Sequence, residues 1–350
     1  MYEEYMKKCF ELAKKGLGKT SPNPMVGCVV LDKNGNEIST GYHAKYGENH
    51  AERDALLKLK NGEEKDGTII VSLEPCSHFG KTPPCVDLII ERKLKRVVFA
   101  MKDPNPIVSS VKKLEDNGIE VVSGVLEDEA KELNEVFITN MTLKRPFVAL
   151  KSATTLDGKI STRIGDSKWI TSPSARDKGH ELREIYDAVL TTSNTVLADN
   201  PNFDNKQKIL IDRTLKVPTN MKFFNTGKIL VVHDENIPSP ENKENMTYIP
   251  CPTLNNKIDV TALLKILFEN KIMSIFVEAG GTFNGTLVDL EIVDKIYQFF
   301  APKILGDNTG KSAYIGRNIQ KIKNCVEFKT QAVEQIGEDI LITLKKQKSE

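Results

Sequence analysis

The sequence predicts an α/β protein that is divided into two domains. Its 350 residues correspond to about two domains of roughly 150 residues each. Short apolar runs typical of strands alternate with segments of helical periodicity, as in layered α/β folds. Lys144-Arg145-Pro146 interrupts this alternation near the middle of the chain, because proline disfavours helical geometry in the residue before it. We therefore expect one domain over residues 1–144 and a second over residues 145–350.

The composition excludes several classes of function. Lys and Arg number 49 against 48 Asp and Glu, a net charge of +1, so the chain lacks the basic field that attracts nucleic acid or anionic membranes. Its apolar runs are shorter than the roughly 20 residues that cross a bilayer, and the first ten residues lack the apolar core of a signal peptide. We expect a cytoplasmic protein whose six cysteines are reduced thiols.

The first half begins with an amphipathic helix followed by a hairpin. Apolar residues recur at helical spacing from Tyr2 to Ala13, and Gly16 ends this helix. Val26–Leu31 and Glu37–Tyr42 flank a turn of the Asp-x-Asn-Gly type and predict two paired strands. The remaining expected elements are, in order, a helix over 51–59, a strand over 68–73, a helix over 85–92, a strand over 96–101, a helix over 112–117, a strand over 119–122 and a helix over 126–140.

The second half repeats the alternation with different spacing. A strand over Phe147–Ser152 follows the interruption at Pro146. Further strands are expected over 188–191, 209–211, 228–233 and 274–278, helices over 174–186 and 260–270, and a terminal antiparallel pair over 325–329 and 340–344. No repeat relates the two halves, so we expect them to have different functions.

One histidine, two cysteines and a glutamate in the first half predict a catalytic zinc site. His50 stands at the start of an expected helix, Cys76 follows an expected strand, and Cys85 opens the next helix. Three such ligands leave the fourth tetrahedral position for water, which is the pattern of catalytic zinc. Glu52 lies two residues after His50, so its carboxylate can move protons beside the metal without ligating it.

The order of these residues is typical of zinc nucleobase deaminases, whose signature is His-x-Glu followed by Pro-Cys-x-x-Cys. Eight residues rather than two separate Cys76 from Cys85. The residues alone leave two other interpretations open. One is a tRNA or nucleotide deaminase with a non-catalytic second domain, against which the near-neutral charge and the long cysteine spacing argue. The other is a zinc-stabilised structural or binding module.

The long cysteine spacing resembles the deaminase domain of the bifunctional riboflavin biosynthesis deaminase/reductases. Leu73–Cys85, Pro22–Gly27 and Asp103-Pro104-Asn105-Pro106 carry the resemblance. It implies a cytidine-deaminase-like αβα sandwich that binds a phosphoribosylaminopyrimidine through Asn23, His43, His78, Lys81, Asp103 and Asn105. Ser109 and Ser110 stand where this family usually has glycines, so we expect a differently shaped loop there.

The second half resembles the reductase domain of the same family. The residues alone already indicate a phosphate-binding turn, because Gly280-Gly281 follow an expected strand and their backbone amides can approach a pyrophosphate. The matching segments are Arg145–Ile160, Ser167–Thr171, Asp187–Leu190, Thr195–Pro201 and Ala301–Gly306. They imply a dihydrofolate-reductase-like α/β domain that uses NADPH.

The resemblance also implies two sets of contacts in this second domain. Those to NADPH are Ala153, Trp169, Thr195, Asp199, Gly280, Gly281, Thr282, Phe283, Asn284, Gly285 and Thr286. Those to the substrate are Lys151, Ser167, Arg183, Phe203, Lys206 and Glu278. Lys206 stands where the family normally has arginine, which replaces a planar fork of donors by a point charge.

The resemblance implies two consecutive reactions, with one zinc ion per chain and NADPH as cofactors. The first is hydrolytic deamination of 2,5-diamino-6-(5-phosphoribosylamino)pyrimidin-4-one. The second is reduction of the ribosyl group of 5-amino-6-(5-phosphoribosylamino)uracil to ribityl. We expect a small phosphorylated pyrimidine as the partner, neither nucleic acid nor membrane, and a homo-oligomer as is common in the family.

Overall fold

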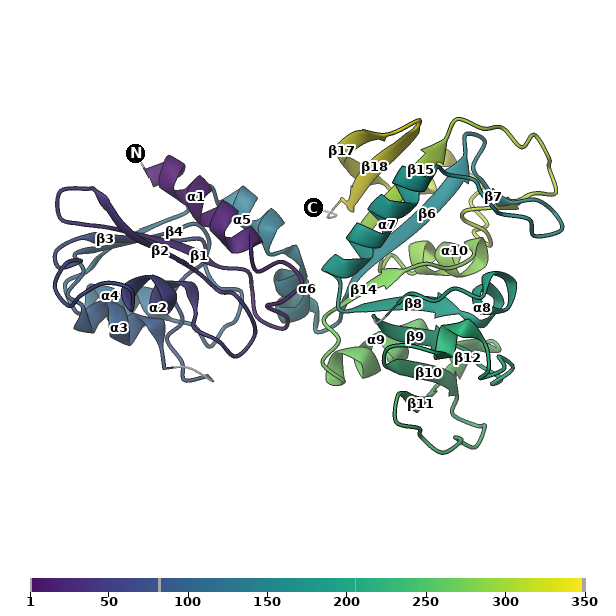
Figure 1. The fold of residues 1–350 in the computed structure, drawn as a ribbon, viewed down its shortest axis with the longest axis horizontal. Helices are drawn as coiled ribbons and strands as arrows, with labels where there is room; N and C mark the ends of the chain where they lie inside the picture. Colours follow the sequence, from purple (N-terminus) through teal and green to yellow (C-terminus); the bar gives the residue numbers. More distant parts are fainter. Residues whose placement is uncertain (1, 81–82, 205, 348–350) are drawn as a thin grey trace. The chain divides into compact units, whose positions relative to one another are not determined.

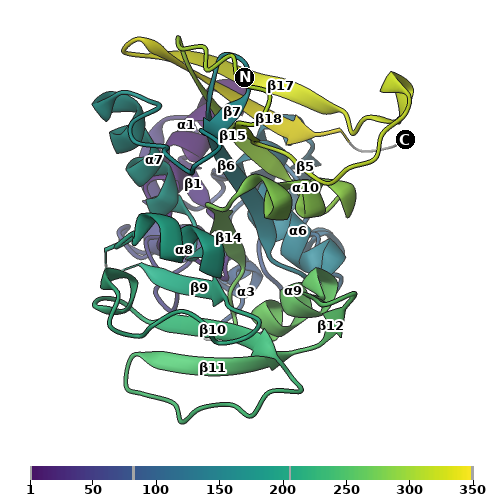
Figure 2. The same cartoon turned by 90° about the vertical axis from the view of Figure 1, so that its right-hand side faces the viewer.

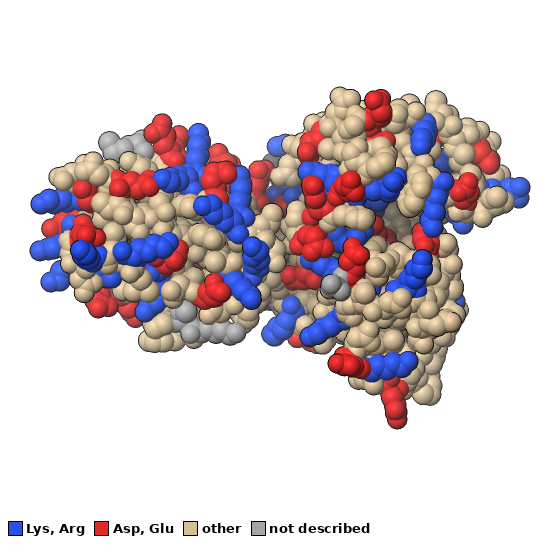
Figure 3. All heavy atoms as spheres, in the orientation of Figure 1, with Lys and Arg blue, Asp and Glu red and all other residues tan. Residues whose placement is uncertain are grey.

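The computed structural model describes residues 2–80, 83–204 and 206–347. The chain forms two compact units, Met1–Lys144 and Arg145–Glu350, each built around its own large sheet (Figure 1). On the face drawn in Figure 3, positive and negative side chains are interspersed over the described residues of both units, without an extended area of one sign. Among these residues no helix combines the length and the apolar character needed to cross a membrane.

The first unit is a five-stranded sheet in the order β2-β1-β3-β4-β5. Its strands are β1 Gly27–Leu31, β2 Glu37–Tyr42, β3 Thr68–Val71, β4 Arg96–Phe99 and β5 Glu120–Ser123. β1 pairs antiparallel with β2 and β3, whereas β3, β4 and β5 are parallel. Helices cover both faces: α1 (Tyr2–Lys14) and α5 (Glu127–Leu133) on one, and α2 (Ala51–Leu56), α3 (Cys85–Glu91) and α4 (Ser110–Glu115) on the other (Figure 1).

The single helix expected over 126–140 is wrong, because the structure has two helices there, α5 and α6 (Glu135–Leu143). Asn134 separates them with φ −109° and ψ 26°. Its side-chain oxygen accepts the Met25 N–H at 2.9 Å and its amide donates to the Met25 carbonyl at 3.0 Å. This pairing with the backbone of a distant segment turns the chain at Asn134 and brings Phe137 of α6 to the same pocket as Pro24.

Helix α2 lies directly against strand β2 because position 41 is glycine. A Cβ added to Gly41 would lie 2.3 Å from the Ala51 carbonyl oxygen and 2.5 Å from the Ala55 nitrogen, both far inside van der Waals contact. The close approach holds the start of α2, where His50 is the N-cap residue and Glu52 follows in the first turn. Two predicted zinc-site residues therefore depend on this glycine for their position.

The second unit is a nine-stranded sheet in the order β11-β10-β9-β8-β14-β6-β15-β18-β17. Its strands are β6 Phe147–Thr155, β8 Ala188–Thr192, β9 Gln207–Ile211, β10 Ile229–Asp234, β11 Met246–Cys251, β14 Ser274–Val277, β15 Lys295–Ala301, β17 Phe328–Ile336 and β18 Asp339–Lys346. The strands from β11 to β15 are parallel, and β18 and β17 continue the sheet antiparallel. The helices are α7 Pro173–Ile185 and α8 Ser193–Asp199 on one face, and α9 Val260–Glu269 and α10 Gly281–Asp289 on the other (Figure 2).

Several elements of the second unit were not expected from the sequence. β11, β15 and α8 were absent from the expected elements, and the terminal strands are longer than expected. β11 is an edge strand that contains Pro250 and buries only part of its side chains, so its apolar pattern is weak. β15 lies between β6 and β18, and its pairing depends on residues far away in the sequence.

We predict that Gly41→Ala destabilises the first unit by about 3 kcal/mol, because overpacking against the backbone of α2 forces the helix outward. Urea unfolding followed by circular dichroism measures this change. Trp169, the only tryptophan, lies in the second unit. The urea concentration at which its fluorescence reports unfolding should therefore be unchanged in the variant. Gly80→Ala is the control, since a Cβ added there meets no heavy atom within 4 Å. Equal stability of the two variants would contradict the prediction.

Candidate active sites

The three predicted zinc ligands meet at one point of the first unit. His50 precedes α2, Cys76 follows β3, and Cys85 is the first residue of α3. His50 Nδ1 lies 3.5 Å from Cys76 Sγ and 3.6 Å from Cys85 Sγ, and all three ligand atoms lie within 4.8 Å of one another. A tetrahedral zinc ion with bonds of about 2.1 Å to nitrogen and about 2.3 Å to sulfur separates such atoms by about 3.6 Å. The donor set therefore fits zinc in both chemistry and spacing.

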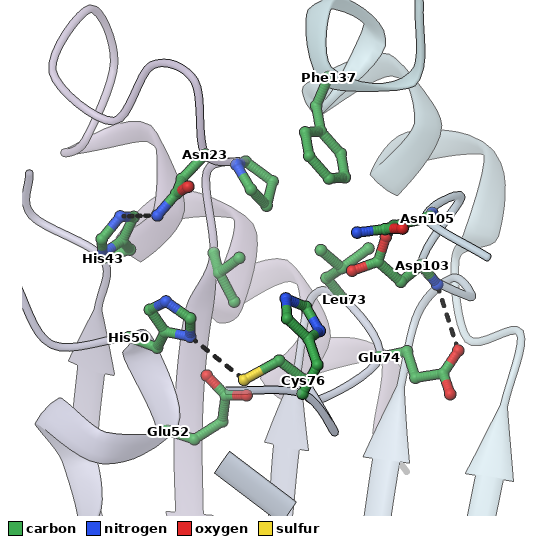
Figure 4. Close-up of a pocket in the computed structure, with 13 residues that line it drawn as sticks. Asn23, His43, His50, Glu52, Leu73, Glu74, Cys76, Asp103, Asn105 and Phe137 are labelled. Carbon is green, nitrogen blue, oxygen red and sulfur yellow. Dashed lines mark hydrogen bonds between the residues drawn. The ribbon is translucent and has the colours of Figure 1, made fainter. Parts of the chain in front are cut away.

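Glu52 lies beside these ligands without joining them. The residue is 3% exposed and lines the same pocket as His50 and Cys76, and Figure 4 shows it next to both. Burial, with a further contribution from the negative charge of the Cys76 thiolate, raises the pKa of Glu52 to about 7. A carboxyl group with a pKa near neutrality can both take up and release a proton, as a general acid–base requires.

Most of the predicted substrate contacts of the first unit line this pocket. Figure 4 shows Asn23 and His43 on one side and Asp103 and Asn105 on the other, with His50, Cys76 and Glu52 at the bottom. His78 also lines the pocket. Its Nδ1 is buried and has no hydrogen-bond partner among the described residues, so it can bind a ligand atom. Lys81 lies outside the described residues.

His43 lines the pocket and holds the side chain of Asn23. It is 2% exposed, and burial lowers the pKa of its ring, so the ring is neutral near pH 7. Its Nδ1 lies 2.9 Å from the Asn49 carbonyl oxygen and its Nε2 lies 3.2 Å from the Asn23 amide nitrogen. Since Nδ1–H must donate to the carbonyl, Nε2 accepts from Asn23. The side-chain carbonyl oxygen of Asn23 then remains to accept from an amino group.

Asp103 and Asn105 belong to a loop that folds on itself. Asp103 Oδ1 accepts the Asn105 N–H at 2.8 Å, and Asn105 Oδ1 accepts the Ile107 N–H at 3.3 Å. Burial raises the pKa of Asp103 to about 6. The loop therefore presents a carboxyl and an amide, which suit the amino and carbonyl groups of a pyrimidine.

A pocket of about 400 Å³ lies in the second unit and is lined by five of the six predicted substrate contacts and two of the eleven predicted cofactor contacts. The predicted substrate contacts that line it are Lys151, Ser167, Arg183, Phe203 and Glu278, and the predicted cofactor contacts that line it are Trp169 and Asp199. They come from β6, α7, α8, the residue that follows β14, and loops. Segments distant in sequence therefore converge on one hollow.

An ion pair organises this second pocket. Arg183 Nε and Nη2 both lie 2.7 Å from Glu278 Oε1, and Lys151 Nζ lies 4.0 Å from Glu278 Oε2. The Arg183 guanidinium also lies 4.7 Å from the centre of the Phe203 ring. Glu278 therefore orients two cations toward the pocket and partly neutralises them.

The remaining predicted residues of the second unit do not line this pocket. Lys206 Nζ donates to the Glu184 carbonyl oxygen at 3.0 Å and lies 3.7 Å from the Glu184 carboxylate. Ala153 lies in β6. Thr195 lies in the first turn of α8, which follows β8, and Gly280–Thr286 form the beginning of α10, which follows β14. Because β8 and β14 are parallel neighbours, the two helix starts lie at the same edge of the sheet, where α/β sheets bind ligands.

The glycines at the start of α10 differ in what surrounds them. A Cβ on Gly281 would lie 2.0 Å from the Ser312 carbonyl oxygen, and one on Gly285 would lie 2.0 Å from the Ile315 carbonyl oxygen. These two glycines therefore allow close packing of the chain. A Cβ on Gly280 would meet no heavy atom within 4 Å, so the N-terminal turn of α10 has room at this position for an anionic group such as a phosphate of NADPH.

Several residues that line the pockets were not predicted from the sequence. In the second unit they include Arg176, Gly179 and His180 on α7, and in the first unit Glu74. Positions 176, 179 and 180 lie on the same helix face as Arg183, so helical spacing from Arg183 could have indicated them. Arg176 places its guanidinium 4.2 Å from the centre of the Trp169 ring, which is 62% exposed. Trp169 is therefore a pocket wall and not a core residue.

Two family models match the chain. The cytidine and deoxycytidylate deaminase zinc-binding region matches residues 1–101, and the RibD C-terminal domain matches residues 146–342. The fold and the two pockets thus define a zinc-dependent deaminase joined to a reductase domain.

Curated relatives match both halves together. RibD of Aquifex aeolicus is 42% identical and the match covers 98% of each chain, and RibD of Actinobacillus pleuropneumoniae is 39% identical over 97% of this chain and 94% of the relative. The Thermotoga maritima structure described as a diaminohydroxyphosphoribosylaminopyrimidine deaminase/5-amino-6-(5-phosphoribosylamino)uracil reductase superposes with a TM-score of 0.86 at 39% identity, covering 99% and 98% of the chains. Acinetobacter baumannii RibD gives 0.88 at 31% identity, covering 99% of both. The chain belongs to the RibD family.

Family membership confirms the predicted fold class and the predicted bifunctional enzyme. The chain is a deaminase and a reductase of riboflavin biosynthesis, with zinc and NADPH as cofactors. The alternative of a tRNA or nucleotide deaminase with a non-catalytic second domain is not supported, because the second half matches the reductase domain of the family.

We predict that Cys76→Ser and Cys85→Ser each reduce the zinc content from about one ion per chain to less than about one tenth, because a neutral hydroxyl is a far weaker zinc ligand than a thiolate. Metal analysis of the purified protein measures the loss. Cys325→Ser is the matched control, since this cysteine is exposed and outside the group. Full zinc content in either ligand variant would contradict the assignment.

Proposed function

We propose that residues 1–144 are the deaminase domain and residues 145–350 the reductase domain of one enzyme that catalyses two consecutive reactions. The substrate of the first domain is 2,5-diamino-6-(5-phosphoribosylamino)pyrimidin-4-one, and its product, 5-amino-6-(5-phosphoribosylamino)uracil, is reduced by the second to the ribityl compound. The observation that carries the proposal is the convergence of His50, Cys76 and Cys85 within 4.8 Å beside the buried Glu52.

In the deaminase domain, His50, Cys76 and Cys85 hold zinc, which when bound supplies a Lewis acid that activates water. The Glu52 carboxylate takes the proton of that water and delivers it to the departing amino group. Asn23 orients the ring, because its amide is fixed by His43 at 3.2 Å and its carbonyl oxygen accepts from a ring substituent. The other contacts to the ring and the phosphate are made by His78, Lys81, Asp103 and Asn105.

In the reductase domain, NADPH when bound supplies a hydride. Ala153, Trp169, Thr195, Asp199 and the start of α10, Gly280–Thr286, hold it. The substrate is held by Ser167, Arg183 and Phe203, with Glu278 fixing the Arg183 guanidinium at 2.7 Å, whereas Lys206 is directed to the Glu184 carbonyl oxygen. Lys151, which lies 4.0 Å from Glu278 and lines the same pocket, is a further substrate contact, and Lys151 and Glu278 are the two candidates for the proton donor.

We also propose that the enzyme is cytoplasmic and forms a homo-oligomer. The support is the resemblance to a family of biosynthetic enzymes in which oligomers are common. A molar mass in light scattering equal to a single chain would contradict the oligomer.

We predict that Glu52→Gln lowers the deamination rate about 10³-fold, because the amide cannot carry the proton from water to the leaving group. The enzyme is incubated with zinc, NADPH and the diaminopyrimidine substrate, and ammonia release and NADPH oxidation are recorded. Zinc content should stay at about one ion per chain, since Glu52 is not a ligand. Adding the deaminated intermediate should restore NADPH oxidation in the variant, and failure to do so would contradict two separate sites.

We predict that NADPH quenches the fluorescence of Trp169 and that Arg176→Gln weakens NADPH binding about 2- to 5-fold, because the variant loses the cation that stacks on the indole. Fluorescence titration gives the dissociation constant directly, since Trp169 is the only tryptophan. Lys178→Gln removes a charge from the same helix but not from the pocket and should bind NADPH normally. Equal affinities of the two variants would exclude a role for the stacked pair.

A further inference from the structure

Glu74 is a buried carboxylate of the deaminase pocket to which the proposed reaction gives no role. It is 6% exposed, follows β3 and lies two residues before Cys76. Its Oε1 accepts the Ser110 N–H at 3.0 Å and the Ser110 hydroxyl at 2.7 Å, and its Oε2 accepts the Asp103 N–H at 3.2 Å. Figure 4 shows the bond between Glu74 and Asp103 at the edge of the pocket.

The three donors stand at the two ends of one loop. Asp103 begins the segment that carries both proposed ring contacts, and Ser110 is the first residue of α4. One carboxylate therefore ties both ends of the segment 103–110 to the end of the strand that leads to Cys76. A parallel tie lies beside it, since Ser77 Oγ accepts the Ser109 N–H at 2.9 Å. The loop is thus connected twice to the segment that contains a zinc ligand.

Ser110 contributes more to this tie than its backbone. It is 0% exposed, so its hydroxyl has no access to water, and among the described residues the hydroxyl bonds to Glu74. A hydrogen bond to an ionised carboxylate is stronger than one between neutral groups. A glycine at this position would supply the N–H alone. The serine therefore adds a third, charge-assisted bond to a carboxylate that would be costly to bury without donors.

We propose that Glu74, acting through Ser110 and the Asp103 N–H, is the positioning residue that holds Asp103 and Asn105 over the zinc-binding residues and thereby sets affinity for the aminopyrimidine ring. The proposal rests on the proposed deaminase function. Neither Glu74 nor Ser110 supplies a proton to the reaction, which is the role of Glu52. Loosening the loop therefore weakens substrate binding and leaves the chemical step of bound substrate intact.

Two variants remove defined parts of the tie. Ser110→Ala deletes the hydroxyl and keeps the N–H. Glu74→Gln replaces one oxygen by an NH₂ group, which must then face either the Asp103 N–H or the two donors of Ser110, donor against donor. Ser109→Ala is the matched control, because Ser109 is exposed and makes its bond to Ser77 through the backbone, which alanine retains.

The measurement is the steady-state deamination of the diaminopyrimidine substrate by the full-length zinc enzyme. We expect KM to rise about 5-fold in Ser110→Ala, which loses one hydrogen bond to a charged group. We expect it to rise about 20-fold in Glu74→Gln, which disturbs several of the hydrogen bonds to the loop. We expect kcat to stay within 2-fold, zinc to stay at about one ion per chain, and NADPH oxidation of supplied intermediate to be unchanged. Ser109→Ala should match the wild type.

The outcomes separate the positioning role from its alternatives. A fall in kcat with constant KM in either variant would make Glu74 part of the chemical step and overturn the proposal. Loss of zinc from Ser110→Ala would make the tie a structural part of the metal site and would also overturn it, as would unchanged kinetics in both variants. A wild-type enzyme that releases no ammonia contradicts the proposed function itself, which distinguishes that failure from a failure of the loop proposal.

Discussion

Buried charge is the constraint around which both pockets are built. An ionised carboxylate costs several kcal/mol to remove from water unless donors or cations compensate it. In the first unit Glu74 meets this cost with two backbone N–H groups and one hydroxyl. Each of these donors lies in the loop that bears Asp103. The requirement to satisfy one carboxylate therefore also fixes the loop whose Asp103 and Asn105 line the pocket.

The second unit compensates its buried carboxylate with cations. Glu278 is paired with Arg183 at 2.7 Å and faces Lys151 at 4.0 Å. An arginine with two N–H groups on one oxygen is held in a single orientation, so the pocket is organised before any ligand enters. A few such placed cations can bind a small phosphorylated substrate in a protein whose net charge is only +1. A net charge close to zero is therefore compatible with an anionic substrate.

The sequence was sufficient to predict what depends on local spacing. Helix and strand alternation, the division near residue 145 and the donor types of the zinc group are all readable from neighbouring residues. The break at Asn134 was not, because it depends on bonds to Met25, 109 residues away. The same holds for Glu74, whose partner Ser110 is 36 residues distant. Helical spacing from Arg183 could have indicated Arg176. Lys206 was predicted from the family resemblance, but its side chain donates to the Glu184 carbonyl oxygen and does not line the pocket.

Glu52 lies beside the metal-binding residues, and burial is the largest influence on its pKa. Without a cation, burial raises the pKa of Glu52 to about 7, so the group is partly protonated near neutral pH. A cation held by His50, Cys76 and Cys85 favours the ionised form, since an opposite charge nearby lowers the pKa of a carboxyl group. Metal binding and deprotonation of Glu52 therefore reinforce each other. In the proposed reaction, the form of Glu52 that a bound cation would favour is also the form that accepts the proton of water.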